Sequence, residues 1–352
     1  MVEFFIYIAI ILFIITFVQI VGINELLSDL TDKKTEEVSE KDNKRNAWLM
    51  LIGMIGFFVY FVYQFIASQN ILLPIAASEH GPEIDRMFNI TVLIITIVFF
   101  ITHGLMAWYG FRYYFRKDNK ATFYPHNNKL EIAWTVVPTI VLTGLIFYGL
   151  VVWGNVMNPS SKEAMVIEVF AKQFQWTVRY PGGDEELGKA NYKLIKGTNA
   201  LGLDSSDTKA WDDIVTRELH LPVNKSVLMV FRSQDVIHSA YLPHFRVQMN
   251  CVPGMTTQFQ FTPTMTTDDM RREINNEEFD YALICNKICG AAHYTMRMKV
   301  VVESEEDYKQ WLSEQSVFYA EKISSQPAEI PIEEAKGIKS DLIEVKEHKT
   351  TI

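Results

Sequence analysis

Residues 285–296 read Cys-Asn-Lys-Ile-Cys-Gly-Ala-Ala-His-Tyr-Thr-Met, so two cysteines, a histidine and a methionine fall within twelve positions. Thiolate and imidazole groups suit copper, zinc or iron, and a thioether adds a preference for copper because methionine is a soft, weak ligand. Taken singly, Met296 is typical of a core residue and His293 of a polar surface residue, while Cys285 and Cys289 could form a local disulfide. The four residues together predict a metal site.

The sequence on both sides of this stretch predicts a β-rich domain. From about residue 160 to residue 303, short stretches of β type such as "TTQFQFTP" alternate with turn signals, and no strong helical pattern lies between them. This pattern indicates a β-sandwich or barrel. Two polar segments, 184–220 and 264–280, are expected to be loops or small insertions. The tail 304–352 is rich in Glu and Lys; we expect it to begin with a helix at 304–315 and otherwise to be solvated.

The metal site needs a further ligand from elsewhere in the chain. His238, in "DVIHSAYLP", follows the strand-like stretch "VLMVF" and is the best candidate. His220, His244 and His348 are weaker candidates, because nothing in the sequence around them resembles a site.

The first half of the chain carries four apolar runs, each long enough for a membrane span of about 20 residues. They lie near residues 3–23, 47–67, 89–112 and 132–153. The loops 24–46 and 112–131 contain five Lys or Arg residues each, whereas 68–88 contains only Arg86. The positive-inside bias therefore places these two basic loops in the cytoplasm, and the N-terminus, residues 68–88 and everything after about 154 outside.

We expect the first run to be an uncleaved helix. It lacks the basic n-region and the small-x-small cleavage site of a signal peptide. The net charge of −9 argues against a nucleic-acid partner. An odd number of cysteines, three, argues against a disulfide framework, and no CxxCH motif is present to attach haem.

Taken together, the motifs resemble subunit II of the haem–copper cytochrome c oxidases. The family pattern Cys-x-Glu-x-Cys-x3-His-x2-Met is similar to Cys285–Met296, and it follows Asp-Val-x-His-Ser and a Pro-Gly turn, similar here to Asp235–Ser239 and Val252–Gly254. The fourth apolar run adds "LEIAWTVVP", Leu130–Pro138. The resemblance covers about residues 89–303, and the separate motifs occur in the family order.

The resemblance implies a binuclear copper centre, CuA, in a cupredoxin-like barrel that follows membrane α-helical hairpins with four transmembrane helices. In this pattern Cys285 and Cys289 would bridge two copper ions, and His238 and His293 would each bind one. Met296 and the backbone carbonyl of Lys287 would be the weak ligands.

The resemblance also implies the function and the partners. The chain would accept electrons from cytochrome c at CuA and pass them to haem a in subunit I, where oxygen is reduced to water with proton translocation. It would lie in the bacterial inner membrane among lipid, subunit I and other oxidase subunits, with its N-terminus and CuA domain on the periplasmic side. The expected domains are an extra transmembrane hairpin (1–67), the subunit II hairpin (68–154), the CuA domain (155–303) and a charged tail (304–352). The pattern of an extra N-terminal hairpin is similar to that of oxidases that associate with alternative complex III.

Three positions depart from the family pattern. Lys287 stands where the family has a Glu that helps to hold magnesium at the subunit I interface, so the magnesium ion is in doubt; the ammonium group either replaces part of its charge or simply faces solvent. Phe174 stands where the family has the Trp that receives electrons from cytochrome c, and the second Trp is retained as Trp176. Trp176 is either an electron conduit or a core residue. Cys251 is expected to be a buried free thiol.

Glu131 starts the fourth run, and the matching Glu in the family marks the entrance of a proton path into subunit I. A carboxylate at a helix start can also serve only as a partner of the helix dipole.

Three rival functions stay open at this point. A quinol-oxidase subunit II would lack the copper ligands, whereas all five side-chain ligands are present here. A CuA domain of the nitrous-oxide-reductase type would lack the membrane hairpin and "LEIAWT". A structural zinc site could use Cys285, Cys289, His238 and His293 but leaves Met296 unexplained.

Overall fold

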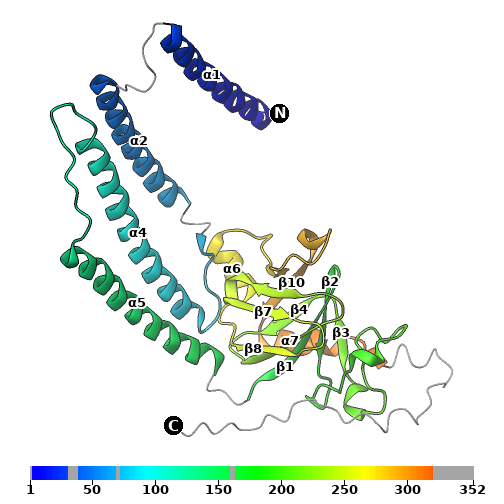
Figure 1. The fold of residues 1–352 in the computed structure, drawn as a ribbon. Helices are drawn as coiled ribbons and strands as arrows, with labels where there is room; N and C mark the ends of the chain where they lie inside the picture. The colour runs from blue at the N-terminus through cyan, green and yellow to red at the C-terminus, as the bar shows by residue number, and fades with distance from the viewer. Residues whose placement is uncertain (1, 31–38, 69–71, 159–162, 320–352) are drawn as a thin grey trace. The chain divides into compact units, whose positions relative to one another are not determined.

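In a computed structural model of the chain, the structure describes residues 2–30, 39–68, 72–158 and 163–319 (Figure 1). The remainder of the predicted tail, 320–352, lies outside the described residues. Contacts divide the chain into two compact units, one of Met1–Asn70 with Val92–Val136 and one of Ile71–Thr91 with Val137–Ile352. The first unit is helical and the second contains the β domain.

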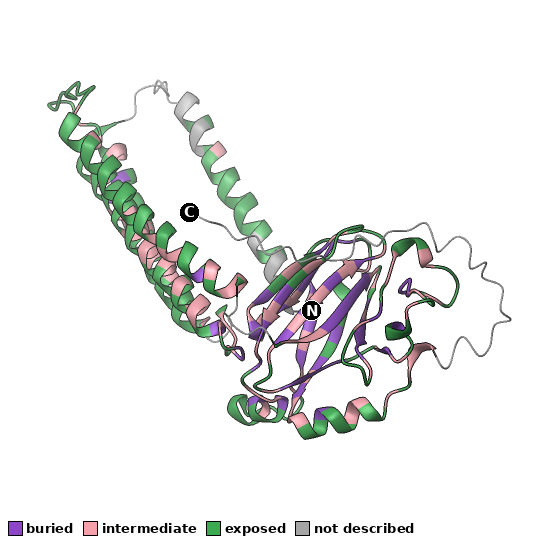
Figure 2. Ribbon diagram, turned by 90° about the horizontal axis from the view of Figure 1, so that it is seen from below, coloured by how far each residue is buried: buried purple, intermediate pink, exposed green. Residues whose placement is uncertain are grey.

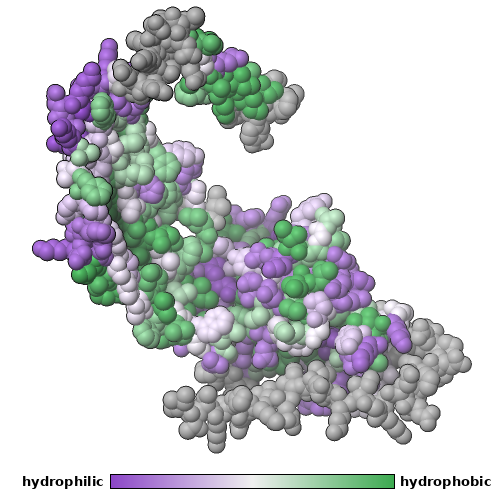
Figure 3. Space-filling model, in the orientation of Figure 1, coloured by the Kyte–Doolittle hydropathy of each residue, from purple (hydrophilic) through white to green (hydrophobic). Residues whose placement is uncertain are grey.

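The long helices are α1 (Val2–Leu30), α2 (Glu40–Ala67), α4 (Gly81–Arg112) and α5 (Asn128–Met157). Three of them, α2, α4 and α5, are long and apolar enough to cross a membrane, and in α1 the apolar part found among the described residues is shorter, Ile11–Ile23. Apolar side chains cover much of their surface (Figure 3). The prediction of transmembrane helices followed by a β domain is therefore confirmed for three spans, whereas the fourth predicted span, near residues 3–23, is not confirmed among the described residues.

Within the helical unit, α2 packs along α4 through aromatic rings. Phe61 lies 4.9 Å from Phe99 between ring centroids, and Trp48 meets Phe111 edge-on at 4.6 Å. Gly110 permits this close approach, because a Cβ there would lie 2.1 Å from the methyl group of Met50. Such ring pairs stabilise by about 0.5–1.5 kcal/mol each beyond the area that they bury. The second predicted helix is thus packed against the third by specific contacts.

The β domain consists of two five-stranded sheets, ordered β3-β2-β1-β5-β8 and β4-β10-β9-β6-β7. The strands of the first sheet are β1 (Met165–Lys172), β2 (Gln175–Tyr180), β3 (Ile214–Thr216), β5 (Val227–Ser233) and β8 (Thr257–Phe261). Those of the second are β4 (Leu219–Pro222), β6 (His238–Leu242), β7 (Val247–Cys251), β9 (Tyr281–Cys285) and β10 (Arg297–Glu303). Pairing is antiparallel except for β1 with β5 and β4 with β10.

One apolar core joins the two sheets, as expected for a β-sandwich. In β5 the buried residues alternate, with Val227, Met229 and Phe231 inside, because successive side chains of a strand point to opposite faces. The strands accordingly carry most of the buried residues (Figure 2). The helix expected at the start of the tail is present as α7 (Glu305–Ser313), and Ser304 caps it by accepting from Asp307 N.

The segment before α4 belongs to the β domain by its hydrogen bonds. Ala77 N donates to His244 O and Ala77 O accepts from Thr264 N, while the buried Ser78 hydroxyl donates to Phe245 O at 2.7 Å. Arg246 adds a two-pronged ion pair with Asp85 in the first turns of α4, at 2.6 and 2.9 Å. Ala77 and Ser78 are therefore part of the β domain, although α4 and α5 separate them in the sequence from its first strand.

The polar segment after β2 is folded against the first sheet. It includes η1 (Tyr192–Leu194) and η2 (Thr208–Ala210), and it covers a small second core of Phe170, Leu201, Leu203 and Ala210. The other predicted loop, 264–280, contains α6 (Thr267–Ile274). Both segments are thus ordered insertions with local structure.

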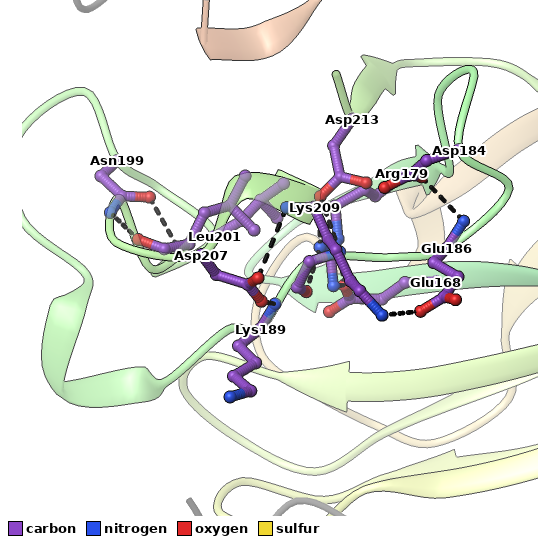
Figure 4. A network of polar contacts seen from close by, with 12 residues as sticks. Glu168, Arg179, Asp184, Glu186, Lys189, Asn199, Leu201, Asp207, Lys209 and Asp213 are labelled. Carbon is purple, nitrogen blue, oxygen red and sulfur yellow. Dashed lines mark hydrogen bonds and ion pairs between the residues drawn. The ribbon is translucent and has the colours of Figure 1, made fainter. Parts of the chain in front are cut away.

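A buried ionic network fixes the first insertion to the sheet (Figure 4). Arg179 forms ion pairs with Glu168 and Asp213, and it donates to the carbonyl of Gly188 at 2.7 Å. Burial alone would raise the pKa of Glu168, but the guanidinium groups of Arg179 and Arg232 bring that pKa below its usual range. Burial raises the pKa of Asp213 to about 6 in spite of Arg179. The cation of Arg179 is therefore shared by two buried acids.

We expect replacement of Arg179 by Leu to lower the free energy of unfolding by about 3–5 kcal/mol, since it leaves the buried carboxyl group of Asp213 without its cation and leaves Glu168 with Arg232 alone. Guanidinium unfolding of the full-length protein in detergent, followed by near-ultraviolet circular dichroism, measures the change. Lys209→Gln is the matched control, because it breaks only the exposed pair with Glu186 and should leave the midpoint unchanged. Equal midpoints for the two variants would contradict this assignment.

Candidate metal centre

The pairing of β6 with β9 brings the predicted ligands together. Ala240 of β6 lies opposite Cys285 at the end of β9. His238 is two residues before Ala240 and so lies on the same face of β6, next to the cysteine. The ligand atoms of His238, Cys285 and Cys289 all lie within 4.8 Å of one another.

The other predicted ligands extend this cluster. His293 and Met296 come from the loop and the short η4 turn (His293–Thr295) that follow β9. The Nδ1 atom of His293 lies 3.5 Å from Cys289 Sγ, and the Met296 sulfur lies 3.9 Å from the same atom. The carbonyl oxygen of Lys287 lies 3.2 Å from Cys285 Sγ. Every residue that the sequence proposed as a metal ligand is therefore in one place.

The two thiols do not form a disulfide. Their sulfur atoms are 3.9 Å apart, whereas a disulfide bond is about 2.05 Å long. His293 adjoins Cys289, and Nδ1 of His238 lies 3.9 Å from Sγ of Cys285 at the other end of the pair. The order of donors is therefore imidazole, thiol, thiol, imidazole. This arrangement has an imidazole on the outer side of each sulfur.

Four of the donor side chains are shielded from solvent, whereas His293 is half-buried. His238 and Met296 are buried, and so are both thiols. Ile288 and Tyr294, from the same loop, are 87% and 85% exposed. The ligand loop therefore presents its donors inward and its large apolar side chains outward.

The electrostatics of the site favour a bound cation. Burial, and after it the neighbouring Cys285, raises the pKa of Cys289 to about 11. Metals bind the thiolate form, so a bound ion must supply the positive charge that stabilises two adjacent thiolates. Two sulfurs, two imidazole nitrogens, a thioether and a carbonyl form a soft donor set, which fits copper.

Asp235 fixes the orientation of the first histidine. Its Oδ1 lies 2.9 Å from Nε2 of His238, which leaves Nδ1 directed at the sulfur. Burial alone would raise the pKa of Asp235, but the hydrogen bonds from the Gln173 backbone and from His238 bring it below its usual range. Asp235 is thus a carboxylate acceptor beside the ligand; its motif was recognised in the sequence, but its contact was not.

Trp176 is buried beside the cluster. Its indole Nε1 donates to the carbonyl of Met296 at 3.3 Å, and its ring lies 6.2 Å from the His238 ring. Phe174 packs against Gly290, where a Cβ would come within 2.8 Å of its ring. Cys251 lies opposite His238 in β7, and burial raises its thiol pKa to about 12. It is a buried free thiol, as expected.

Glu131 lies in the first turn of α5. Its carboxylate accepts from the backbone N–H of Asn127 at 3.2 Å, while the Asn127 side chain accepts from Leu130 N at 3.1 Å. This reciprocal arrangement satisfies N–H groups that the start of a helix otherwise leaves without partners. Glu131 therefore has a capping contact, whatever else it does.

Gln173 was missed in the sequence. Its side-chain Nε2 donates to the carbonyl of Cys289 at 2.5 Å, and its backbone N–H donates to Oδ2 of Asp235 at 2.7 Å. The only signal was its position before Phe174 in "QFQW". Which segments it would contact depends on the packing of the two sheets.

Comparison with known proteins gives consistent matches. Residues 66–152 match the family model described as "Cytochrome C oxidase subunit II, transmembrane domain", and residues 165–305 match "Cytochrome C oxidase subunit II, periplasmic domain". The chain is 38% identical over 237 residues to an "Alternative cytochrome c oxidase subunit 2" of Bradyrhizobium diazoefficiens, covering 67% of this chain and 81% of that protein.

A "Cytochrome c oxidase subunit 2" of Thermostichus vulcanus is 27% identical over 266 residues, covering 68% of this chain and 77% of that protein. Among solved structures, the periplasmic domain of subunit II of cytochrome oxidase of Bradyrhizobium japonicum aligns with a TM-score of 0.30 and 22% identity, over 44% of this chain and 94% of that one.

Proposed function

The chain belongs to the cytochrome c oxidase subunit II family, and from this premise we propose that His238, Cys285, Cys289 and His293 hold its binuclear CuA centre. Met296 and the Lys287 carbonyl complete the proposed ligand set. The observation that carries this proposal is the row of imidazole, thiol, thiol and imidazole, with neighbouring donors 3.5–3.9 Å apart. The chain is the electron-accepting subunit of a terminal oxidase, and the oxygen chemistry takes place in subunit I.

The protein residues prepare the site for one-electron transfer. Held by Cys285, Cys289, His238 and His293, a copper centre would supply one-electron transfer with little rearrangement of its ligands. Asp235 holds His238 in one tautomer and orientation, and Trp176 supports the loop from the buried side through the Met296 carbonyl. Because β6 pairs with β9, the positions of His238 and Cys285 are set before an ion binds. We propose as a second role that Trp176 conducts electrons toward the ligands; its ring lies 6.2 Å from the His238 ring, which supports this proposal.

We propose that the protein lies in a bacterial inner membrane with four transmembrane helices, and with its N-terminus and copper domain outside. The distribution of Lys and Arg in the loops supports this topology. The proposed domain limits are 1–67, 68–154, 155–303 and 304–352. Subunit I and other oxidase subunits are its partners in the complex; a cytochrome c is the proposed donor, and alternative complex III a proposed neighbour of the extra hairpin.

Visible and electron paramagnetic resonance spectra of the purified full-length protein test the copper assignment. We expect a purple, mixed-valence signal with two copper ions per chain. Cys289→Ala should abolish it, because Cys289 Sγ adjoins Cys285, His293 and Met296, whereas Cys251→Ala, which removes a buried thiol outside the cluster, should retain it. A colourless, silent protein with stoichiometric zinc would establish the structural zinc site instead.

We further propose that the exposed Lys287 ammonium replaces part of the charge of the magnesium ion that the family holds at this position. The carbonyl of Lys287 keeps its place beside Cys285 whatever the side chain is. Metal analysis of the purified oxidase should therefore find copper but no magnesium at residue 287, and Lys287→Glu should introduce a magnesium site without loss of copper. Stoichiometric magnesium beside Lys287 in the unaltered complex would overturn the idea.

For Glu131 we propose a role at the entrance of a proton path, in addition to its capping contact. Glu131→Ala in the oxidase should slow proton uptake severalfold, because it removes the carboxyl group. Asn127→Ala removes the cap on Leu130 but keeps the carboxyl group, so uptake should be close to that of the unaltered enzyme. Proton uptake after a single turnover in reconstituted vesicles gives the comparison. Equal uptake by both variants would leave Glu131 with a structural role only.

A further inference from the structure

We propose that Gln173 is a positioning residue that locks the two ligand-bearing segments of the metal centre to each other. The effect on the metal centre rests on the proposed function, whereas the contacts of Gln173 do not depend on it. Gln173 lies in the turn between β1 and β2, which belong to the first sheet, whereas all the ligands come from β6, β9 and the loop after β9 in the second sheet. A single turn of one sheet thus reaches the site carried by the other.

Gln173 contacts both segments with different groups. Its side-chain amide donates to the carbonyl of Cys289, in the segment that carries the two thiols. Its backbone N–H donates to one oxygen of Asp235, and the other oxygen of Asp235 faces Nε2 of His238. The chain of contacts therefore runs from the Cys289 backbone through Gln173 and Asp235 to the His238 ring.

The loop after β9 has the shape that this contact requires. Gly290 has φ +140°, and a Cβ on it would lie 2.8 Å from Nε2 of Gln173 and 2.8 Å from the ring of Phe174. A side chain at residue 290 would therefore push the Gln173 amide away from the neighbouring carbonyl of Cys289. The glycine and the glutamine fit each other across the two sheets.

The consequence concerns the relative position of His238 and Cys289. Strand pairing fixes His238 beside Cys285, but Cys289 lies four residues beyond β9, in a loop. The Gln173 contact ties this loop residue to the same frame as the histidine. A rigid ligand frame limits the rearrangement that accompanies electron transfer, and it also limits the exposure of the Cys289 thiol when no metal is bound.

Gln173 is exposed, so a rival explanation is that it only contacts the electron donor. A donor contact would change the KM for cytochrome c and leave the ligand loop and the metal spectrum as they are. A positioning role changes the loop in the absence of any donor. The two roles therefore differ in measurements made on the isolated protein.

The test compares Gln173→Glu with Gln175→Glu. The first has the same shape as glutamine but cannot donate to the Cys289 carbonyl. The second alters a neighbouring exposed glutamine whose side chain accepts from Arg217. In the metal-free full-length protein, alkylation of Cys289 should be severalfold faster in Gln173→Glu than in the unaltered protein, and unchanged in Gln175→Glu. Mass spectrometry of the labelled peptides separates Cys289 from the buried Cys251.

The same two variants are then loaded with copper. We expect Gln173→Glu to lose copper to a chelator severalfold faster and to show an altered hyperfine pattern, with Gln175→Glu matching the unaltered protein. Unchanged Cys289 labelling in Gln173→Glu, or an effect confined to the KM for cytochrome c, would overturn the positioning role. Absence of a copper signal in the unaltered protein would refute the proposed function instead, and the labelling result would still decide the role of Gln173.

Discussion

The antiparallel pairing of β6 with β9 is the constraint on which the metal centre depends. It sets Ala240 opposite Cys285, and beyond the strand end Asn286 N still donates to Ser239 O. A slip of one residue would turn His238 to the opposite face of its strand and remove it from the sulfur. The buried alternation of Tyr281, Leu283 and Cys285 prevents such a slip, because it would expose all three. The hydrophobic pattern of a strand thus determines which histidine meets which thiol.

The β domain contains two groups of buried charge, and the same physics applies to both. Glu168 and Asp213 are buried acids that Arg179 and Arg232 compensate from within the protein. The thiols Cys285 and Cys289 have no such cation among the described contacts, and burial together with the neighbouring Cys285 raises the pKa of Cys289. A site built from ionisable groups without a protein counter-charge is one in which binding a metal ion and ionising the ligands occur together. The network around Arg179 stabilises the fold, whereas the two thiols depend on a bound metal ion for the compensating positive charge.

The features that the sequence predicted are those carried by local patterns. Cys285, Cys289, His293 and Met296 lie within one short stretch, and the long apolar runs need only be counted. Arg179 and Glu168 were not recognised as a buried pair, because charged residues in a strand usually mark its solvent face; here the folded insertion covers them. Ala77 and Ser78 were assigned to a loop between helices, since no local pattern shows that they hydrogen-bond to residues 245 and 264. Such contacts depend on segments far apart in the sequence.

The bonds around Ala77 and Asp85 affect how the metal centre can work. Electron transfer between proteins depends steeply on distance, so a copper domain on a loose tether would deliver electrons erratically. Here the segment before α4 is hydrogen-bonded into the domain, and the largely buried Arg246 guanidinium ties Asp85 of α4 to the turn after β6. At the other end of the hairpin, Val156 and Met157 of α5 pack against the domain core, and Asn155 donates to Glu83 of α4 at 3.3 Å. Both helix ends are therefore built into the domain that holds the ligands, which favours a fixed distance between the copper site and the outer ends of these two helices.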